Sequence, residues 1–151
     1  MVISKYNTCL VRDRDFMDEY EVKVLDPGEV YEFCKNYIFK DISPDEQFYV
    51  IALNCKTEII GFSLVGQGGL VSATVEPRSV FRFAIGANAA NIILIHNHPS
   101  GGSDPSEDDI AATKRLCECG EVLGIKVLDH IVYADTNYIS LRASNLANFD
   151  W

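Results

Sequence analysis

The sequence predicts one mixed-sheet α/β or α+β domain, in which helices and strands alternate along the chain. Its 151 residues match the commonest single-domain size and suffice to bury a sizeable core. Hydrophobic residues make up 48% and charged residues 23%, as in ordinary soluble globular proteins. Segments of helical and of strand periodicity interleave without repeats or low-complexity linkers. We therefore expect a single domain over residues 1–151, with residues 1–20 as a loose N-terminal extension.

The first half of the chain predicts two helices and three strands. Asp26 and Pro27 form a helix start signal, and apolar residues at helical spacing follow as far as residue 39. Residues 46–68 contain two β-rich runs around a turn-prone segment at 54–57, which predicts an antiparallel hairpin. A third strand is expected near residues 70–75. The second helix is expected within residues 77–90, where a proline suits the start.

The second half predicts a buried strand, a long helix and a final pair of strands. Residues 91–98 are apolar at odd and even positions until the histidines, so this strand is covered on both faces and lies centrally in the sheet. Residues 106–125 show amphipathic helical spacing, and residues 127–141 contain two strands around a turn at 135–137.

Charge and cysteine usage narrow the classes of partner and compartment. The formal net charge of −9 and the sequence pI of about 4.7 disfavour strong binding to nucleic acid by this domain. Five cysteines form an odd set without a CxxC pair, as expected of thiols in a reducing compartment. The sequence shows neither a signal peptide nor a membrane-spanning run. We therefore expect a cytoplasmic protein without a membrane partner.

Two histidines at the end of the buried strand predict a metal site. His96 and His98 are two residues apart, so both imidazoles face the same side of the strand. Asp109 lies eleven positions after His98, and the Gly/Pro loop between them can return it toward the histidines. Zinc suits these ligands best, although iron, manganese and cobalt also fit the ligand types. An alternative is that Ser106 and Asp109 form only a capping box and that the histidines are structural.

The pattern His96-x-His98-Pro99 followed by Ser106-x-x-Asp109 resembles the JAMM motif of the JAB/MPN metalloprotease superfamily. The strings "HNHPSG", "PSEDDIAATKRL" and "LGIKVLDHIV" resemble the RadC branch in particular. The resemblance implies a three-layer, cytidine-deaminase-like fold with a mixed central sheet flanked by helices. It also implies a zinc ion held by His96, His98 and Asp109, with a water molecule in the open position.

The resemblance further implies a metallopeptidase acting on peptide or isopeptide bonds of a protein or peptide substrate. Glu46, in "SPDEQFYVIAL", would handle the protons of the attacking water, with Asp45 as the competing assignment, and Ser106 would stabilise the oxyanion. Full-length RadC proteins carry a helix-hairpin-helix region, which we expect to be absent from this chain. A DNA-repair-associated role, suggested by the family label, and a non-catalytic interaction module are the alternatives. His130 is expected to be structural.

Overall fold

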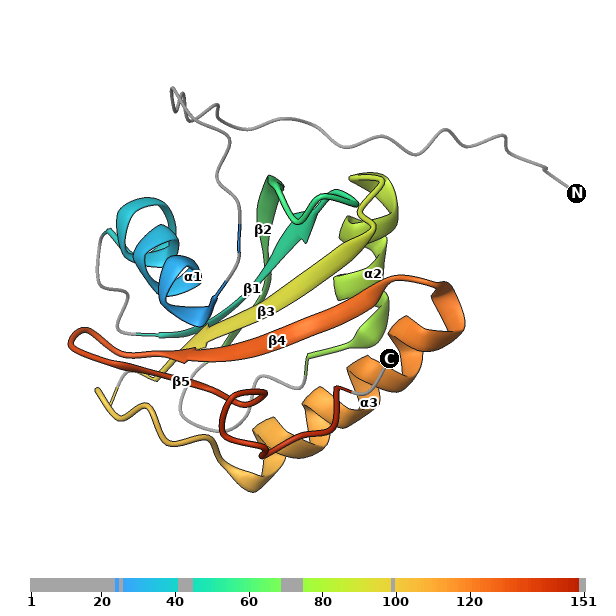
Figure 1. Cartoon of the computed structure of the whole chain (residues 1–151). Coiled ribbons are helices and arrows are strands. Elements are labelled where there is room, and N and C mark those ends of the chain that lie inside the picture. The colour runs from blue at the N-terminus through green and yellow to red at the C-terminus, as the bar shows by residue number, and fades with distance from the viewer. Residues whose placement is uncertain (1–23, 25, 41–44, 69–74, 99, 150–151) are drawn as a thin grey trace, which may run out of the picture.

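The computed structural model describes residues 24, 26–40, 45–68, 75–98 and 100–149 (Figure 1). Among these residues three α-helices and five strands alternate, as the periodicity predicted, and a short π-helix extends the first helix. The elements are α1 (Pro27–Phe33), η1 (Cys34–Ile38), β1 (Glu46–Leu53), β2 (Ile59–Gly68), α2 (Pro77–Gly86), β3 (Asn91–Asn97), α3 (Glu107–Leu123), β4 (Lys126–Tyr133) and β5 (Tyr138–Ser140).

The five strands form one mixed sheet in the order β2-β1-β3-β4-β5. β1 pairs antiparallel with both β2 and β3, and β4 pairs antiparallel with β5. β3 and β4 are parallel, because α3 carries the chain back between them. The predicted hairpin and the predicted central position of the apolar strand are both confirmed.

Helices cover both faces of the sheet, so the described residues form three layers (Figure 1). α1 packs on one face, and α2 and α3 pack on the other. Alternation along β3 divides its side chains between the two cores, because successive residues point to opposite faces. Ile92 and Leu94 lie in the core beneath α2 and α3, whereas Ile93 and Ile95 lie in the core beneath α1. The predicted mixed α+β fold is confirmed.

Side-chain caps determine where the helices begin. Asp26 caps α1 in a capping box with Glu29, with proline in the first turn as the sequence predicted. α3 begins after Ser106, whose side chain forms a second capping box with Asp109. α3 ends at Gly124, whose φ of 69° suits glycine in the left-handed region.

Two predictions fall outside the described residues. The first is the strand expected near residues 70–75, of which only Val75 is described, and Val75 lies outside any strand. The second is the loose extension at residues 1–20. Among the helices that the structure describes, none is both long and apolar enough to cross a bilayer.

Candidate metal centre

The C-terminal end of β3 places His96 and His98 on the face of the sheet that α3 covers. His96 pairs with Phe48 of β1 and is completely buried. The two rings are nearly parallel, with centroids 5.8 Å apart, so Phe48 provides an apolar wall beside the imidazole. His98 lies just beyond the strand and its side chain keeps 18% of its surface exposed. The pair therefore has a buried member and a member that solvent reaches.

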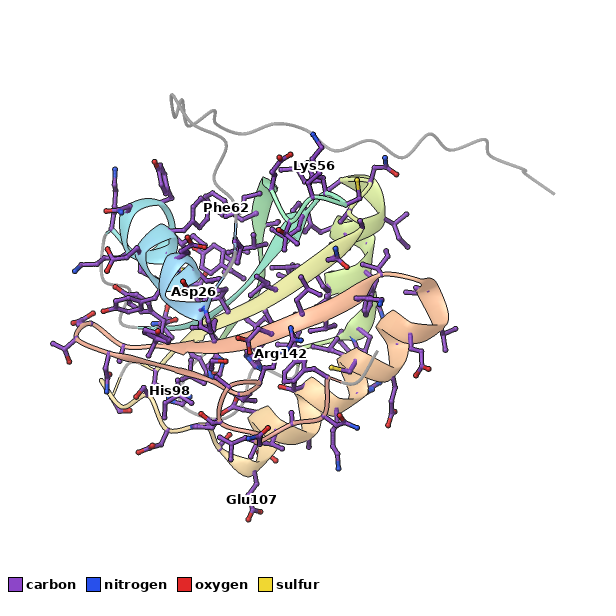
Figure 2. All side chains as sticks on the ribbon, in the orientation of Figure 1. Asp26, Lys56, Phe62, His98, Glu107 and Arg142 are labelled. Carbon is purple, nitrogen blue, oxygen red and sulfur yellow. The ribbon has the colours of Figure 1, made fainter. Side chains whose placement is uncertain are left out.

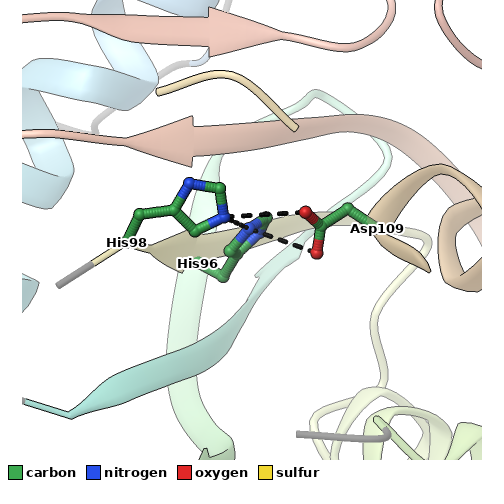
Figure 3. A group of neighbouring side chains, drawn as sticks. All are labelled: His96, His98 and Asp109. Carbon is green, nitrogen blue, oxygen red and sulfur yellow. Dashed lines mark hydrogen bonds and ion pairs between the residues drawn. The ribbon is translucent and has the colours of Figure 1, made fainter. Parts of the chain in front are cut away.

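The first turn of α3 brings Asp109 to the two histidines, as the spacing predicted (Figure 3). The chain reverses after His98, where Gly101 adopts a φ of 79° and donates its N–H to the His98 carbonyl. His96 Nε2 then lies 3.4 Å from Asp109 Oδ1, and His98 Nε2 lies 3.6 Å from Asp109 Oδ2. Both Nε2 atoms face the carboxylate and are 2.9 Å apart. Figure 2 shows Glu107, from the same helical turn, pointing away into solvent.

The donor set fits a small tetrahedral cation. Ligand atoms about 2.0–2.2 Å from a tetrahedral zinc ion are about 3.3–3.5 Å apart, and the imidazole-to-carboxylate distances lie close to this range. The two Nε2 atoms are 2.9 Å apart and must separate by about half an ångström to reach it. His98 Nδ1 lies 3.0 Å from the Gly102 carbonyl, which only accepts hydrogen bonds, so Nδ1 carries a proton. In the neutral ring, Nε2 therefore presents a lone pair toward His96 and Asp109. Lone pairs and a carboxylate that converge in this way need a cation or a proton between them.

The pKa values of Asp109 and His98 also indicate that the site needs a positive charge. Burial alone would raise the pKa of Asp109, but the interactions with His96, His98 and Ser106 outweigh burial and hold this pKa far below its ordinary range. The Asp109 carboxylate, as hydrogen-bond acceptor, raises the pKa of His98 against the opposing effect of burial, and the charge of Glu46 adds to the increase. The site therefore favours positive charge between the three side chains.

Ser106 is held by the cap of α3. Its hydroxyl donates to Asp109 Oδ2 at 2.6 Å and accepts the Asp109 backbone N–H at 3.1 Å, while its own N–H donates to the same Oδ2 at 2.7 Å. Ser106 therefore caps α3 while Asp109 also takes part in the cluster with His96 and His98. The hydroxyl hydrogen must leave Asp109 before it can reach an oxyanion, so the oxyanion role of Ser106 stays a prediction.

Glu46 begins β1 on the same face of the sheet as the histidines. It precedes Phe48 by two residues, so its side chain shares the face of Phe48 and His96. Asn97 fixes the backbone on both sides of Glu46, because its Oδ1 accepts the Gln47 N–H at 2.8 Å and its Nδ2 donates to the Asp45 carbonyl at 3.3 Å. The structure thus places Glu46 close enough to influence His98, while its catalytic role stays a prediction.

Sequence reasoning missed how three other residues support this site. Asn97 is the middle residue of the "HNH" string, and its contact with β1 depends on strand pairing that the string does not show. Thr113 lies four residues after Asp109, on the same helix face, which is a signal that the sequence offered. His130 lies outside the His96–His98–Asp109 cluster found among the described residues, and its structural role stays a prediction, but it contacts His96 directly. Complete burial lowers the pKa of His130 well below its usual value and keeps the ring neutral.

Comparison with known proteins identifies the family of the chain. The RadC-like JAB domain model matches residues 24–146. A UPF0758 protein from Caldanaerobacter subterraneus subsp. tengcongensis is 47% identical over 105 residues, covering 70% of this chain and 45% of that protein. A UPF0758 protein from Staphylococcus haemolyticus is 44% identical over 128 residues, covering 85% of this chain and 54% of that protein.

A further UPF0758 protein, from Bacillus cereus, is 43% identical over 113 residues, covering 74% of this chain and 50% of that protein. The chain spans about half the length of the curated relatives it matches. The family match covers most of the chain, and each of these three alignments covers more than two thirds of it. The chain therefore belongs to the RadC-like JAB domain family.

Proposed function

We propose that the protein is a zinc-dependent hydrolase that cleaves peptide or isopeptide bonds in a protein or peptide substrate. The observation that carries this proposal is the convergence of His96 Nε2, His98 Nε2 and the Asp109 carboxylate within 4.8 Å of one another. Two imidazoles and one carboxylate leave one corner of a tetrahedron for solvent, as in catalytic zinc sites. A zinc ion bound there supplies a water of near-neutral pKa and a Lewis acid for the scissile carbonyl.

The residues around the three ligands divide the remaining work. Glu46 accepts a proton from the attacking water and returns it to the departing amine, the role of a general acid–base. Phe48 and the core behind it exclude water from the buried side of His96, so that the reaction occurs at the exposed side of His98. Ser106 stabilises the oxyanion if its hydroxyl turns away from Asp109. The reducing cytoplasm remains the expected compartment.

Zinc content and peptide hydrolysis test this proposal together. The wild-type protein, purified without a histidine tag, is expected to bind one zinc ion, and His96→Ala and Asp109→Ala are expected to bind none. With zinc bound, Glu46→Gln is expected to lower the hydrolysis of a fluorogenic peptide library about 100-fold or more. Glu107→Gln removes the same charge from a side chain that points into solvent and is expected to retain wild-type activity.

Three outcomes contradict parts of the proposal. A wild type that takes up no zinc from zinc-containing buffer refutes the metal site. A zinc-loaded Glu46→Gln variant that hydrolyses peptides at the wild-type rate refutes the assignment of Glu46. A zinc-loaded wild type that cleaves no peptide or isopeptide substrate refutes the hydrolase and leaves the non-catalytic interaction module and the DNA-repair-associated role.

A further inference from the structure

We propose that Thr113 and His130 are positioning residues that hold His96 in the tautomer whose Nε2 is free to bind a cation. The inference rests on the proposed metal site and explains how the fold prepares its most buried member. A ligating histidine usually donates its second ring N–H to a carboxylate, a carbonyl or water. In this protein His96 Nδ1 faces a second histidine instead, at 2.8 Å from His130 Nε2. Which of the two rings donates this hydrogen bond decides whether His96 can bind metal.

The donor and acceptor of each hydrogen bond can be assigned in turn, beginning at a carbonyl oxygen on α3. Thr113 Oγ1 lies 2.6 Å from the backbone carbonyl of Asp109, and a carbonyl can only accept. The single hydroxyl hydrogen of Thr113 is therefore used for Asp109. Thr113 Oγ1 also lies 2.6 Å from His130 Nδ1, so it must accept there, and His130 Nδ1 carries a proton.

Because His130 is neutral, its proton on Nδ1 also decides which ring donates in the hydrogen bond between His130 and His96. His130 and Thr113 are both completely buried, and a buried charge without a partner of opposite charge costs several kcal/mol. A neutral His130 with its proton on Nδ1 offers only a lone pair at Nε2. His96 Nδ1 must then donate, which leaves the lone pair of His96 Nε2 facing Asp109 Oδ1 at 3.4 Å. The chain of bonds thus begins at the Asp109 carbonyl and ends opposite the Asp109 carboxylate.

A β-bulge explains why His130 reaches His96 at all. The pairing of β3 with β4 shifts between Ile92 and Ile93, so that one extra residue of β4 lies between Val127 and Asp129. The bulge moves the following residues of β4 to the other face. His130 therefore shares the face of Val127 and lies opposite Leu94, beneath α3. Without the extra residue His130 would point toward α1, away from His96.

The tautomers of the three histidines test this inference without any metal. The chain contains only His96, His98 and His130, so ring ¹⁵N spectra of untagged, metal-free protein can be assigned by single substitutions. At a pH where His96 and His130 are neutral, both rings are expected to carry their proton on Nδ1. A His130 ring with its proton on Nε2 would overturn the inference, because that proton would occupy His96 Nδ1.

A matched pair of variants tests the role of the hydroxyl. Thr113→Val has nearly the same size but cannot accept the His130 N–H, whereas Thr113→Ser keeps the hydroxyl. In Thr113→Val the His130 proton is expected to move to Nε2 and the His96 proton to its own Nε2, which blocks cation binding. Zinc affinity, measured by competition with a chelator, is expected to fall about 10- to 100-fold in Thr113→Val and to stay at the wild-type level in Thr113→Ser.

The outcomes separate this inference from the proposed function. Equal zinc affinity of Thr113→Val and wild type overturns the positioning role and leaves the zinc hydrolase standing. A wild type that binds no zinc refutes the zinc-dependent hydrolase. In that case the histidine tautomers of the metal-free protein still decide whether the chain of hydrogen bonds exists. Urea denaturation shows whether Thr113→Val is folded, and if it is not, the wild-type tautomers alone support or overturn the inference.

Discussion

At the scale of single residues, Asp109 joins the cap of α3 to the cluster of metal-ligand types. One carboxylate oxygen, Oδ2, accepts two hydrogen bonds from Ser106, and the other, Oδ1, faces His96. Its backbone carbonyl accepts the Thr113 hydroxyl. The sequence presented capping and metal binding as alternatives for Asp109, and the structure shows that they are compatible, because Oδ2 accepts both Ser106 hydrogen bonds while it faces His98, and Oδ1 faces His96. The position of the carboxylate is thus fixed by the helix start before any cation arrives.

The pKa of His98 gives a prediction for pH dependence. The hydrogen bond to Asp109 raises this pKa above the ordinary value of 6.5, so protonated His98 stabilises the metal-free fold. That contribution is complete below pH 6.5 and is lost as the pH rises through the pKa of folded His98. Zinc must displace the same proton, so apparent zinc affinity is expected to increase over this range.

NMR titration of His98 in metal-free protein, followed by chelator competition at several pH values, checks this prediction. His98→Gln serves as the control for the stability curve, because it removes the titrating ring while keeping a polar side chain. A His98 pKa at or below 6.5 would contradict the electrostatic account of the site.

At the scale of elements, the last residues of β3 and His98 just after it serve both faces of the sheet. His96 and His98 face α3, whereas Asn97 between them uses its amide to bind the backbone of β1 on both sides of Glu46. One three-residue segment therefore places two predicted metal ligands and the predicted proton acceptor. The alternation of a strand makes this division possible, because neighbouring side chains point to opposite faces.

Removal of the Asn97 amide is expected to affect stability and catalysis differently from zinc binding. Asn97→Ala leaves the Gln47 N–H without its acceptor and is expected to cost about 1–3 kcal/mol of unfolding free energy. Glu46 then loses its fixed backbone, so kcat falls while zinc content stays at one ion. Asn91→Ala, at the opposite end of β3, is the control and should leave kcat unchanged. Unchanged kcat in Asn97→Ala would rule out this role of the amide.

Close packing between α3 and the start of β4 gives a second prediction at this scale. A Cβ atom on Gly120 would lie 2.4 Å from the Ile125 carbonyl oxygen and 3.4 Å from the Phe81 ring. Gly120→Ala is therefore expected to lower the unfolding free energy by about 1–3 kcal/mol, despite the better helix propensity of alanine. Gly61→Ala, where the added Cβ meets nothing within 4 Å, is the control, measured by the same urea denaturation. An unaltered midpoint for Gly120→Ala would contradict this packing.

Local sequence patterns predicted the elements well, and long-range pairing explains what they did not predict. The apolar run of residues 91–97 and the capping residue Ser106 act over a few positions, so the sequence shows them directly. The contact between His130 and His96 depends on a bulge in β4 and on the parallel pairing of β3 with β4. Neither feature has a local signal in the sequence, because the two histidines lie 34 positions apart and the bulge depends on the pairing of β3 with β4.

At the scale of the whole molecule, the predicted ligands meet where the end of β3 faces the first turn of α3 (Figure 3). The predicted ligands come from β3 and α3, the predicted proton acceptor from β1, and the supporting histidine from β4. Three strands of the sheet and one helix therefore contribute residues to the predicted site. The predicted ligand set rested on the HxH spacing and the JAMM-like pattern, and the structure brings all three residues together. The spacing of apolar residues does not determine which metal ion binds.

The most direct measurement of the central claim is an anomalous difference map from crystals of zinc-loaded protein, recorded on both sides of the zinc absorption edge. We predict one strong peak about 2.0–2.2 Å from His96 Nε2, His98 Nε2 and an Asp109 carboxylate oxygen, with His130 outside this shell. A map without a peak at these atoms, or with a peak bound by His130 instead of Asp109, would contradict the claim that β3 and α3 together hold a single catalytic zinc ion.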